Sequence, residues 1–185
     1  MTASSTKLIR HIAGFILGIT IFAVLIPTGL FFGSPMLDGI LGWSPLGTPI
    51  LRTILGVVFL LPGLVFMAWS NLFLVIRGKG GPADGFGVAV SPRTEKLVES
   101  GPYRCTRNPM VFGAHMCYLA VVLFIGSPMG LVVIAIFIPM TVFYLKRVEE
   151  PRLEEDFGES YDDYRRRVSM IVPLPRLWKK DRVGT

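Results

Sequence analysis

The sequence predicts an all-α integral membrane fold, with about four transmembrane helices and a C-terminal interfacial amphipathic helix. Hydrophobic residues make up 51% of the 185 residues and charged residues only 17%, whereas about 25% of the residues in soluble domains are charged. Long uncharged runs alternate with basic segments, and each run is long enough for one or two membrane spans. We expect residues 1–185 to form a single membrane domain.

The first half of the chain predicts two of these helices. The first covers about 12–32, a run of 21 uncharged residues. No small-residue cleavage site follows this run, so we expect the helix to be retained rather than removed as a secretory signal. Residues 33–51 are rich in Gly and Pro, which favours an outer loop. The second helix covers about 53–76, where 24 uncharged residues can span a bilayer with some tilt.

A helical hairpin is predicted in the second half of the chain. Residues 108–145 form an uncharged interval of 38 residues, which is too long for one span of ~20 residues and fits two. Ser127-Pro128 lies near its middle, and Pro blocks continuation of a helix. The predicted helices therefore cover about 108–126 and 128–146, and their polar ends meet on the same side of the membrane.

The distribution of basic residues predicts the orientation. Of the 19 Lys and Arg residues, 18 lie before residue 12, within 77–107 or within 146–185, and only Arg52 lies elsewhere. The positive-inside rule then places both termini and the loop 77–107 in the cytoplasm. Because topology explains the net charge of +6, no nucleic-acid partner is expected. The two Cys and two His residues lack metal-ligand spacing, so no metal site is expected.

The region after the hairpin predicts a helix over about 149–168. Its apolar positions recur every three or four residues and therefore share one helical face. A charged helix with a single apolar stripe beside a membrane lies on the interface or packs on the bundle. Glu150 belongs to the same face, so we expect its carboxylate to point inward. The residues that form the stripe are Leu153, Phe157, Tyr161, Tyr164 and Val168.

The two polar ends of the hairpin form the candidate active site. An inward-facing Glu at the membrane boundary is costly unless a cation or a hydrogen-bond donor accompanies it. One explanation is a structural ion pair that ties the hairpin together, drawn from Arg107, Arg147, Glu149 and Glu150. The other is a ligand with positive charge and hydroxyl or amine groups. S-adenosylmethionine fits, because carboxylates can hold its amino group or ribose hydroxyls while Arg and helix-start amides hold its carboxylate.

Three motifs stand in the second half of the chain: Gly101-Pro102-Tyr103-Arg104-x-x-Arg107-Asn108-Pro109-Met110-x-x-Gly113, Ser127-Pro128-x-Gly130, and Glu149-Glu150-x-x-Leu153-x-x-x-Phe157-Gly158-x-x-Tyr161-x-x-Tyr164. Together they resemble the integral-membrane methyltransferases, a group that includes isoprenylcysteine carboxyl methyltransferases and phospholipid N-methyltransferases. The resemblance covers roughly 91–175, while the first two helices match only in hydropathy. Asn-Pro-Met at 108–110 looks more like the phospholipid branch, whereas the tail with Phe157-Gly158 and its two tyrosines is more similar to the isoprenylcysteine branch. Val111 stands where the family commonly has Tyr.

The resemblance implies S-adenosylmethionine-dependent methyl transfer to a lipophilic or lipid-bound acceptor at the cytoplasmic membrane face. The residues that it implies for cofactor binding are Tyr103, Arg104, Arg107, Asn108, Pro109, Gly113, Glu149 and Glu150. Those that it implies for catalysis or substrate positioning are Tyr144, Arg147 and Glu150. Asn108 is also a plausible N-cap of the third helix, because Pro follows it at the first helical position.

Two other classes of protein stay open from the sequence. One is a sterol-type membrane reductase, whose C-terminal region can look similar and which would need NADPH. The other is a non-enzymatic membrane protein in which the Arg and Glu residues only hold the hairpin together. The identity of the acceptor, the atom that is methylated and the oligomeric state do not follow from the sequence.

Overall fold

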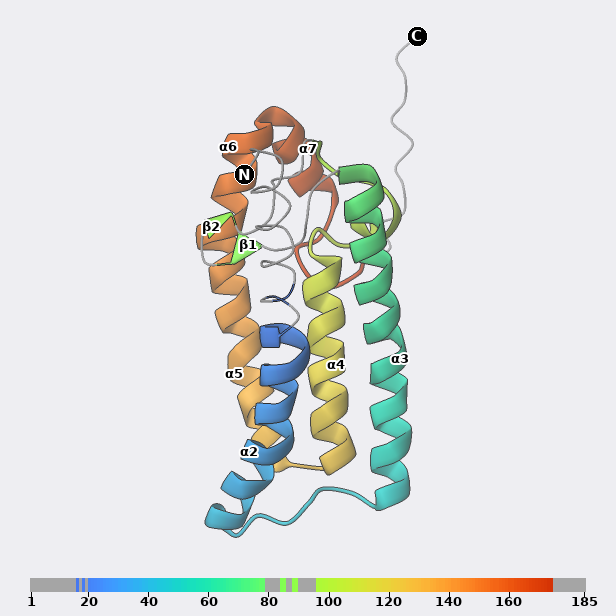
Figure 1. Cartoon of the computed structure of the whole chain (residues 1–185), viewed down its shortest axis with the longest axis vertical. Coiled ribbons are helices and arrows are strands. Elements are labelled where there is room, and N and C mark those ends of the chain that lie inside the picture. Colours follow the sequence, from blue (N-terminus) through green and yellow to red (C-terminus); the bar gives the residue numbers. More distant parts are fainter. Residues whose placement is uncertain are drawn as a thin grey trace, which may run out of the picture.

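The computed structural model describes residues 16, 18, 20–78, 84–85, 88–89 and 96–174. It confirms an all-helical membrane protein, apart from one short pair of antiparallel strands (Figure 1). The elements are η1 (Thr20–Leu25), α2 (Ile26–Leu41), α3 (Pro49–Phe73), η2 (Leu74–Gly78), β1 (Asp84–Gly85), β2 (Val88–Ala89), η3 (Gly101–Arg104), α4 (Pro109–Ile125), α5 (Pro128–Tyr144), η4 (Leu145–Glu149), α6 (Glu150–Phe157) and α7 (Glu159–Arg167).

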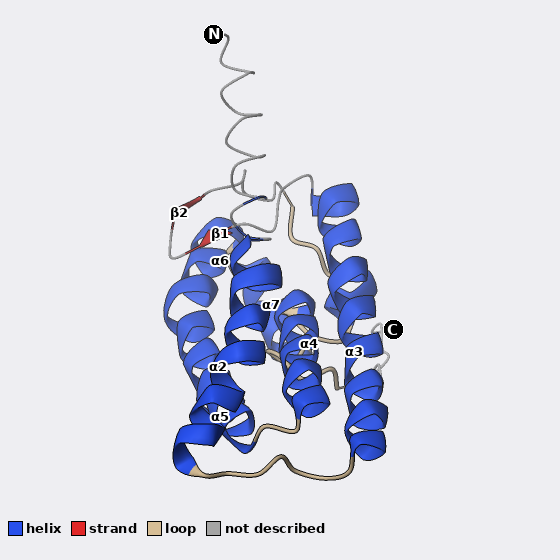
Figure 2. Ribbon diagram, turned by 60° about the horizontal axis from the view of Figure 1, so that its bottom comes forward, coloured by secondary structure: helices blue, strands red, loops and turns tan. Residues whose placement is uncertain are grey.

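Within the described part of the chain, three helical stretches are long and apolar enough to cross a membrane, namely Thr20–Leu41, Pro49–Gly78 and Pro128–Phe157. The fourth predicted span, α4, is an apolar helix of 17 residues, or about 26 Å at 1.5 Å per residue, slightly less than the ~30 Å hydrocarbon core. It runs alongside α3 and α5 (Figures 1 and 2). The hairpin turn is confirmed, because α4 ends at Ile125 and α5 begins at Pro128.

The closest packing in the bundle joins α3 to α4. A Cβ atom added to Gly113 would lie 2.7 Å from the Gly63 carbonyl oxygen and 2.9 Å from the Met67 nitrogen. A Cβ atom on Gly63 would lie 2.8 Å from the Cys117 sulfur. These separations are too short for any side chain, so the two glycines let the helix backbones touch. Small residues have this role in membrane bundles, where lipid provides no hydrophobic drive between helices.

α4 also contacts α5 through polar side chains. His115 places its Nδ1 atom 2.8 Å from the Val111 carbonyl oxygen and its Nε2 atom 3.2 Å from the Thr141 hydroxyl of α5. The imidazole also stacks on Phe137, with ring centroids 5.4 Å apart. Such a hydrogen bond between helices fixes their relative rotation without placing a charge in lipid.

The prediction of an outer loop over 33–51 was wrong for its first part, because α2 continues to Leu41. Pro35 lies inside this helix. The C-terminal part of α2 stays helical because its polar side chains are buried against the α4–α5 hairpin. The Ser34 hydroxyl donates to the Leu30 carbonyl oxygen (2.6 Å), and Asp38 is only 6% exposed. Tertiary contacts thus outweigh the local Gly and Pro signal.

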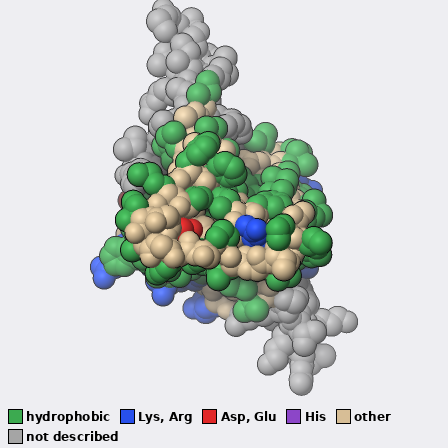
Figure 3. Space-filling view, turned by 90° about the horizontal axis from the view of Figure 1, so that it is seen from below, with side chains coloured by type: hydrophobic (Ala, Val, Ile, Leu, Met, Phe, Trp, Pro, Cys, Tyr) green, Lys and Arg blue, Asp and Glu red, His purple; other side chains and the backbone are tan. Residues whose placement is uncertain are grey.

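The turn between α4 and α5 is held by charged side chains from the other two helices. Asp38 of α2 accepts hydrogen bonds from the Ser127 hydroxyl and from the Met129 nitrogen, at the start of α5. Arg52 donates from its Nη1 atom to the Ile125 carbonyl oxygen at the end of α4 (2.7 Å). Each charge therefore meets the helix terminus of opposite polarity. Seen from this end, the surface is mostly apolar, with small acidic and basic areas (Figure 3).

The single amphipathic helix predicted over 149–168 is instead two helices. α6 continues from α5 through the π-helical turn η4, and α7 follows a break at Gly158, whose φ is +54°. The predicted inward face is confirmed nonetheless, because Tyr161, Tyr164 and Glu150 are buried. α6 and α7 lie at the end of the bundle opposite the Ser127 turn (Figure 1). The basic tail beyond Leu174 lies outside the described residues.

Candidate active site

The segment before α4 is held in place by the chain that follows α7. The Met170 carbonyl oxygen accepts hydrogen bonds from the Asn108 nitrogen (3.1 Å), the Asn108 side-chain amide (3.1 Å) and the Thr106 hydroxyl (2.9 Å). The Arg107 nitrogen also donates to the Ser169 carbonyl oxygen (2.8 Å). Asn108 occupies the N-cap position of α4, but its side chain makes no capping bond. It joins two segments that are far apart in the sequence instead.

A buried ion pair lies where this segment meets the start of α6. The Arg107 Nη1 atom is 2.5 Å from the Glu150 Oε1 atom, and the two side chains are 9% and 12% exposed. Glu150 reaches this position because the wider π-helical turn η4 precedes it, and such turns are frequent at functional sites. The predicted inward orientation of Glu150 is therefore confirmed, and Arg107 is its partner.

Tyr161 of α7 adjoins the same pair. Arg107 Nη1 donates to the Tyr161 hydroxyl at 3.3 Å, and Tyr161 is only 1% exposed. Burial raises the pKa of Tyr161 to about 12, although the positive charge of Arg107 opposes the shift. Tyr161 therefore stays protonated, and its hydroxyl has a hydrogen to donate while its oxygen accepts from Arg107.

Two other tyrosines close the site from the side of η3. The Tyr164 hydroxyl donates to the Tyr103 carbonyl oxygen at 2.7 Å. Burial raises the pKa of both phenols well above the ordinary value, and for Tyr103 the nearby Glu149 carboxylate raises it further. Both phenols are neutral at physiological pH and serve as hydrogen-bonding groups.

We expect the Tyr161 phenol to make the fold sensitive to alkaline pH. Its pKa in the folded protein, about 12, exceeds its ordinary value of 10.0, so the unfolded chain loses this proton first. Folding stability should therefore fall as the pH rises from about 10 to 12. Tyr161→Phe should make that fall shallower, measured as the unfolding temperature in detergent at several pH values. An equally steep fall in the variant would contradict this assignment.

Comparison with known proteins identifies the fold that carries this site. The family model of the phospholipid methyltransferases matches residues 51–160, more than half of the chain. The chain belongs to the phospholipid methyltransferase family. Members of this membrane enzyme family use S-adenosylmethionine as their cofactor, so the expected class of enzyme and its cofactor are confirmed at the level of the family. The match includes α3, so it begins earlier in the chain than the motifs suggested, and it ends within α7.

One curated relative resembles this family member over a long stretch. Methanethiol S-methyltransferase 2 of Bradyrhizobium diazoefficiens is 26% identical over 158 residues. The alignment covers 76% of this chain and 55% of the relative, so the chain spans about half the length of that protein. No solved structure matches the chain significantly.

The ion pair of this methyltransferase family member offers polar atoms suited to the cofactor. Arg107 Nε and Glu150 Oε1 are buried and make no hydrogen bond within the protein, although the latter atom forms the ion pair with Arg107. Buried polar atoms usually have hydrogen-bond partners, so each exception needs an explanation. An anionic acceptor beside a cationic donor matches the amino group and the carboxylate of S-adenosylmethionine. The residues present therefore fit the cofactor.

The other site residues predicted from the sequence differ in burial and in distance from the ion pair along the chain. Glu149, Tyr103 and Tyr144 are partly buried and lie on the same elements as the ion pair or next to them. Gly113 faces α3 in the helix contact described above. Arg147 is exposed, and its guanidinium lies 5.5 Å from the centre of the Phe143 ring. Arg104 is exposed, and Pro109 is the buried first residue of α4. Their roles in binding or catalysis stay predictions.

The sequence did not reveal two parts of this site. The sequence predicts that Tyr161 lies on the inward face, but not that it contacts the ion pair. Its position about three helical turns after Glu150 is the signal that could have indicated this contact. No sequence pattern indicated the contact of Ser169 and Met170 with the segment before α4, because these two residues contribute backbone carbonyl oxygens. Side-chain identity does not determine such contacts.

Proposed function

We propose that this chain transfers a methyl group from S-adenosylmethionine to a lipophilic or lipid-bound acceptor at the cytoplasmic membrane boundary. The observation that carries the proposal is the buried Arg107–Glu150 pair, in which the Arg107 Nε atom has no hydrogen-bond partner, in a chain of this family. A purely structural ion pair would be expected to satisfy its own hydrogen bonds, because a buried pair repays its desolvation only with such bonds.

The basic residues support the orientation. Arg77 of η2, Arg104 of η3 and Lys146 of η4 belong to elements at the end of the bundle that carries α6 and α7. Only Arg52 lies at the other end among the described residues. The positive-inside rule then assigns the Arg107–Glu150 end to the cytoplasm.

In this proposal the residues of the chain bind and orient, and little covalent chemistry is required of them. When bound, S-adenosylmethionine supplies a methyl group on a positively charged sulfur. Arg107 binds a carboxylate, Glu150 accepts hydrogen bonds from an amine or hydroxyls, and Tyr161 keeps Arg107 in position. Holding donor and acceptor in line accounts for much of the rate of such a displacement. The buried tyrosines exclude water from the reaction.

The acceptor determines whether a base is needed. A carboxylate can accept the methyl group directly, whereas an ammonium group or a thiol must first lose a proton, which Glu149 or Glu150 could take. The name of the relative from Bradyrhizobium says that it methylates methanethiol. A small thiol is therefore the second candidate acceptor, and it would also enter easily from an apolar phase.

A panel of acceptors tests this proposal. Purified protein in lipid nanodiscs would receive radiolabelled S-adenosylmethionine with an isoprenylcysteine analogue, phosphatidylethanolamine or a short alkanethiol. We expect one of these classes to be methylated, and S-adenosylhomocysteine to inhibit the transfer. Binding of the cofactor without transfer to any member of the panel would count against this acceptor class.

A further inference from the structure

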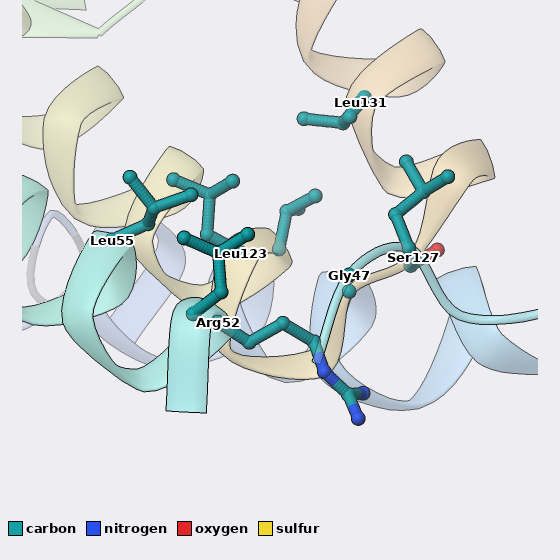
Figure 4. A pocket seen from close by; sticks show the side chains of 10 residues that line it. Gly47, Arg52, Leu55, Leu123, Ser127 and Leu131 are labelled. Carbon is teal, nitrogen blue, oxygen red and sulfur yellow. The ribbon is translucent and has the colours of Figure 1, made fainter. Parts of the chain in front are cut away.

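A cavity lies at the end of the bundle opposite the ion pair. It has a volume of about 220 Å³, is partly open to the surroundings, and is lined by α3, α4, the start of α5 and the loop before α3. Leucines make up half of the residues that line it, and Arg52 is the only charged residue among the described residues that do so. In Figure 4 the Arg52 side chain extends away from Leu55 and ends beneath Gly47, on the side away from Leu131.

Arg52 is only partly used by the protein. Its Nη1 atom donates to the Ile125 carbonyl oxygen, but its Nε atom is buried and has no hydrogen-bond partner. No carboxylate in the described part of the chain pairs with Arg52, because Asp38 instead accepts bonds from Ser127 and Met129. A half-buried guanidinium without a counterion is costly at a membrane boundary. An anion from outside the protein would offset that cost.

The surroundings of Arg52 are rigid. Gly126 adopts a positive φ of 75°, and a Cβ atom there would overlap the Arg52 side chain and lie 2.9 Å from the Leu46 carbonyl oxygen. Leu46 in turn donates to the Gly126 carbonyl oxygen at 2.8 Å. The guanidinium is therefore fixed beside the cavity rather than extended freely into water. A fixed cation next to an apolar wall is a preorganised site.

We propose that this cavity binds one anionic phospholipid of the outer leaflet, with its phosphate on Arg52 and part of an acyl chain along the leucines. Arg52 is near the start of α3, the end of a membrane-spanning stretch, which is where lipid headgroups lie. The guanidinium matches a phosphate with paired donors. The leucine wall continues from the cation into the bundle and gives a reason for a lipid rather than a free anion.

The size of the cavity also favours a bound lipid segment. Sites for drug-sized molecules and cofactors have volumes of about 300–1,000 Å³, so a second cofactor would not fit in 220 Å³. A segment of one acyl chain needs less space and stays continuous with the bilayer. Such a lipid would brace the α4–α5 turn, because Arg52 also binds the last turn of α4.

Native mass spectrometry of the delipidated protein tests the proposal. Phosphatidylglycerol and phosphatidylcholine with identical acyl chains would be added at equal concentration. We expect the wild-type protein to bind phosphatidylglycerol about tenfold more tightly, a difference of ~1.4 kcal/mol. Both lipids carry a phosphate, but the choline cation of phosphatidylcholine opposes the attraction of that phosphate for Arg52. Arg52→Gln should remove this preference. Arg77→Gln, on an exposed residue at the other end of the same helical stretch, should retain it.

A second pair of variants tests the apolar wall without disturbing Arg52. Leu55→Phe should fill the cavity and reduce binding of both lipids, whereas Leu61→Phe, at a lipid-facing position that is 58% exposed, should not. This pair decides the question if Arg52→Gln fails to fold. Equal binding of both lipids by the wild-type protein would overturn the proposal, as would unchanged selectivity in Arg52→Gln. Displacement of phosphatidylglycerol by inorganic phosphate, with no effect of Leu55→Phe, would indicate a simple anion site instead.

Discussion

Glu150→Gln should reduce methyl transfer by about 100-fold or more while most of the protein stays folded in detergent. Gln has nearly the same shape but no charge, so Arg107 would remain buried without its counterion at 2.5 Å. Gln also cannot offer the charged acceptor that Glu150 offers to the cofactor's amino group. A hydrogen bond to a charged group contributes ~1.5–3 kcal/mol, and each ~1.4 kcal/mol lost from the transition state corresponds to a factor of ten in rate. The measurement is single-turnover transfer of a radiolabelled methyl group, corrected for the folded fraction.

Glu155→Gln is the matched control for this variant. Glu155 lies on the same short helix α6 but is exposed. We expect transfer by this variant to match the wild-type protein, because a solvated carboxylate on the surface contributes little. If folded Glu150→Gln transferred methyl groups as fast as Glu155→Gln, the ion pair would be structural and the active site would lie elsewhere.

Gly113→Leu should destabilise the bundle by roughly 3 kcal/mol, the cost of forcing a large side chain into a well-packed contact. The added side chain would collide with the Gly63 carbonyl oxygen and the Met67 nitrogen, both of which are backbone atoms that cannot rotate away. The helices α3 and α4 would have to separate, which removes the closest contact in the bundle. The unfolding temperature in a mild detergent reports this loss.

Gly33→Leu provides the comparison for that substitution. Gly33 lies in α2, and no heavy atom lies within 4 Å of a Cβ atom placed there. The same substitution should therefore be neutral or slightly stabilising, because Leu favours helices more than Gly does. A Gly113→Leu protein as stable as Gly33→Leu, but unable to bind S-adenosylmethionine, would make Gly113 a cofactor contact, as the sequence resemblance implies.

Much of the fold could be predicted because lipid imposes a strong constraint on sequence. Uncharged runs of the length of a bilayer predicted the helices, and Ser127-Pro128 predicted the turn between α4 and α5. The inward face of the C-terminal helices followed from the spacing of Tyr161 and Tyr164 relative to Glu150. These features depend on local pattern, which a single sequence carries.

The features that the sequence did not predict depend on contacts between distant segments. Gly33, Ser34 and Pro35 locally favour a loop, but burial of Ser34 and Asp38 against the hairpin keeps α2 helical to Leu41. The Asn108 side chain could have capped α4, and only the approach of Met170 from the C-terminal segment directs it elsewhere. The sequence did not predict the break between α6 and α7, because the apolar spacing on either side of Gly158 fits one continuous helix.

Calorimetric titration of the wild-type protein in detergent with S-adenosylmethionine tests the central claim most directly. The same titration with NADPH distinguishes a methyltransferase from the reductase class, and S-adenosylhomocysteine confirms the site. The Arg107–Glu150 site predicts saturable binding of S-adenosylmethionine at about micromolar affinity and no binding of NADPH. Absence of S-adenosylmethionine binding by folded protein, or binding of NADPH in its place, would contradict this account.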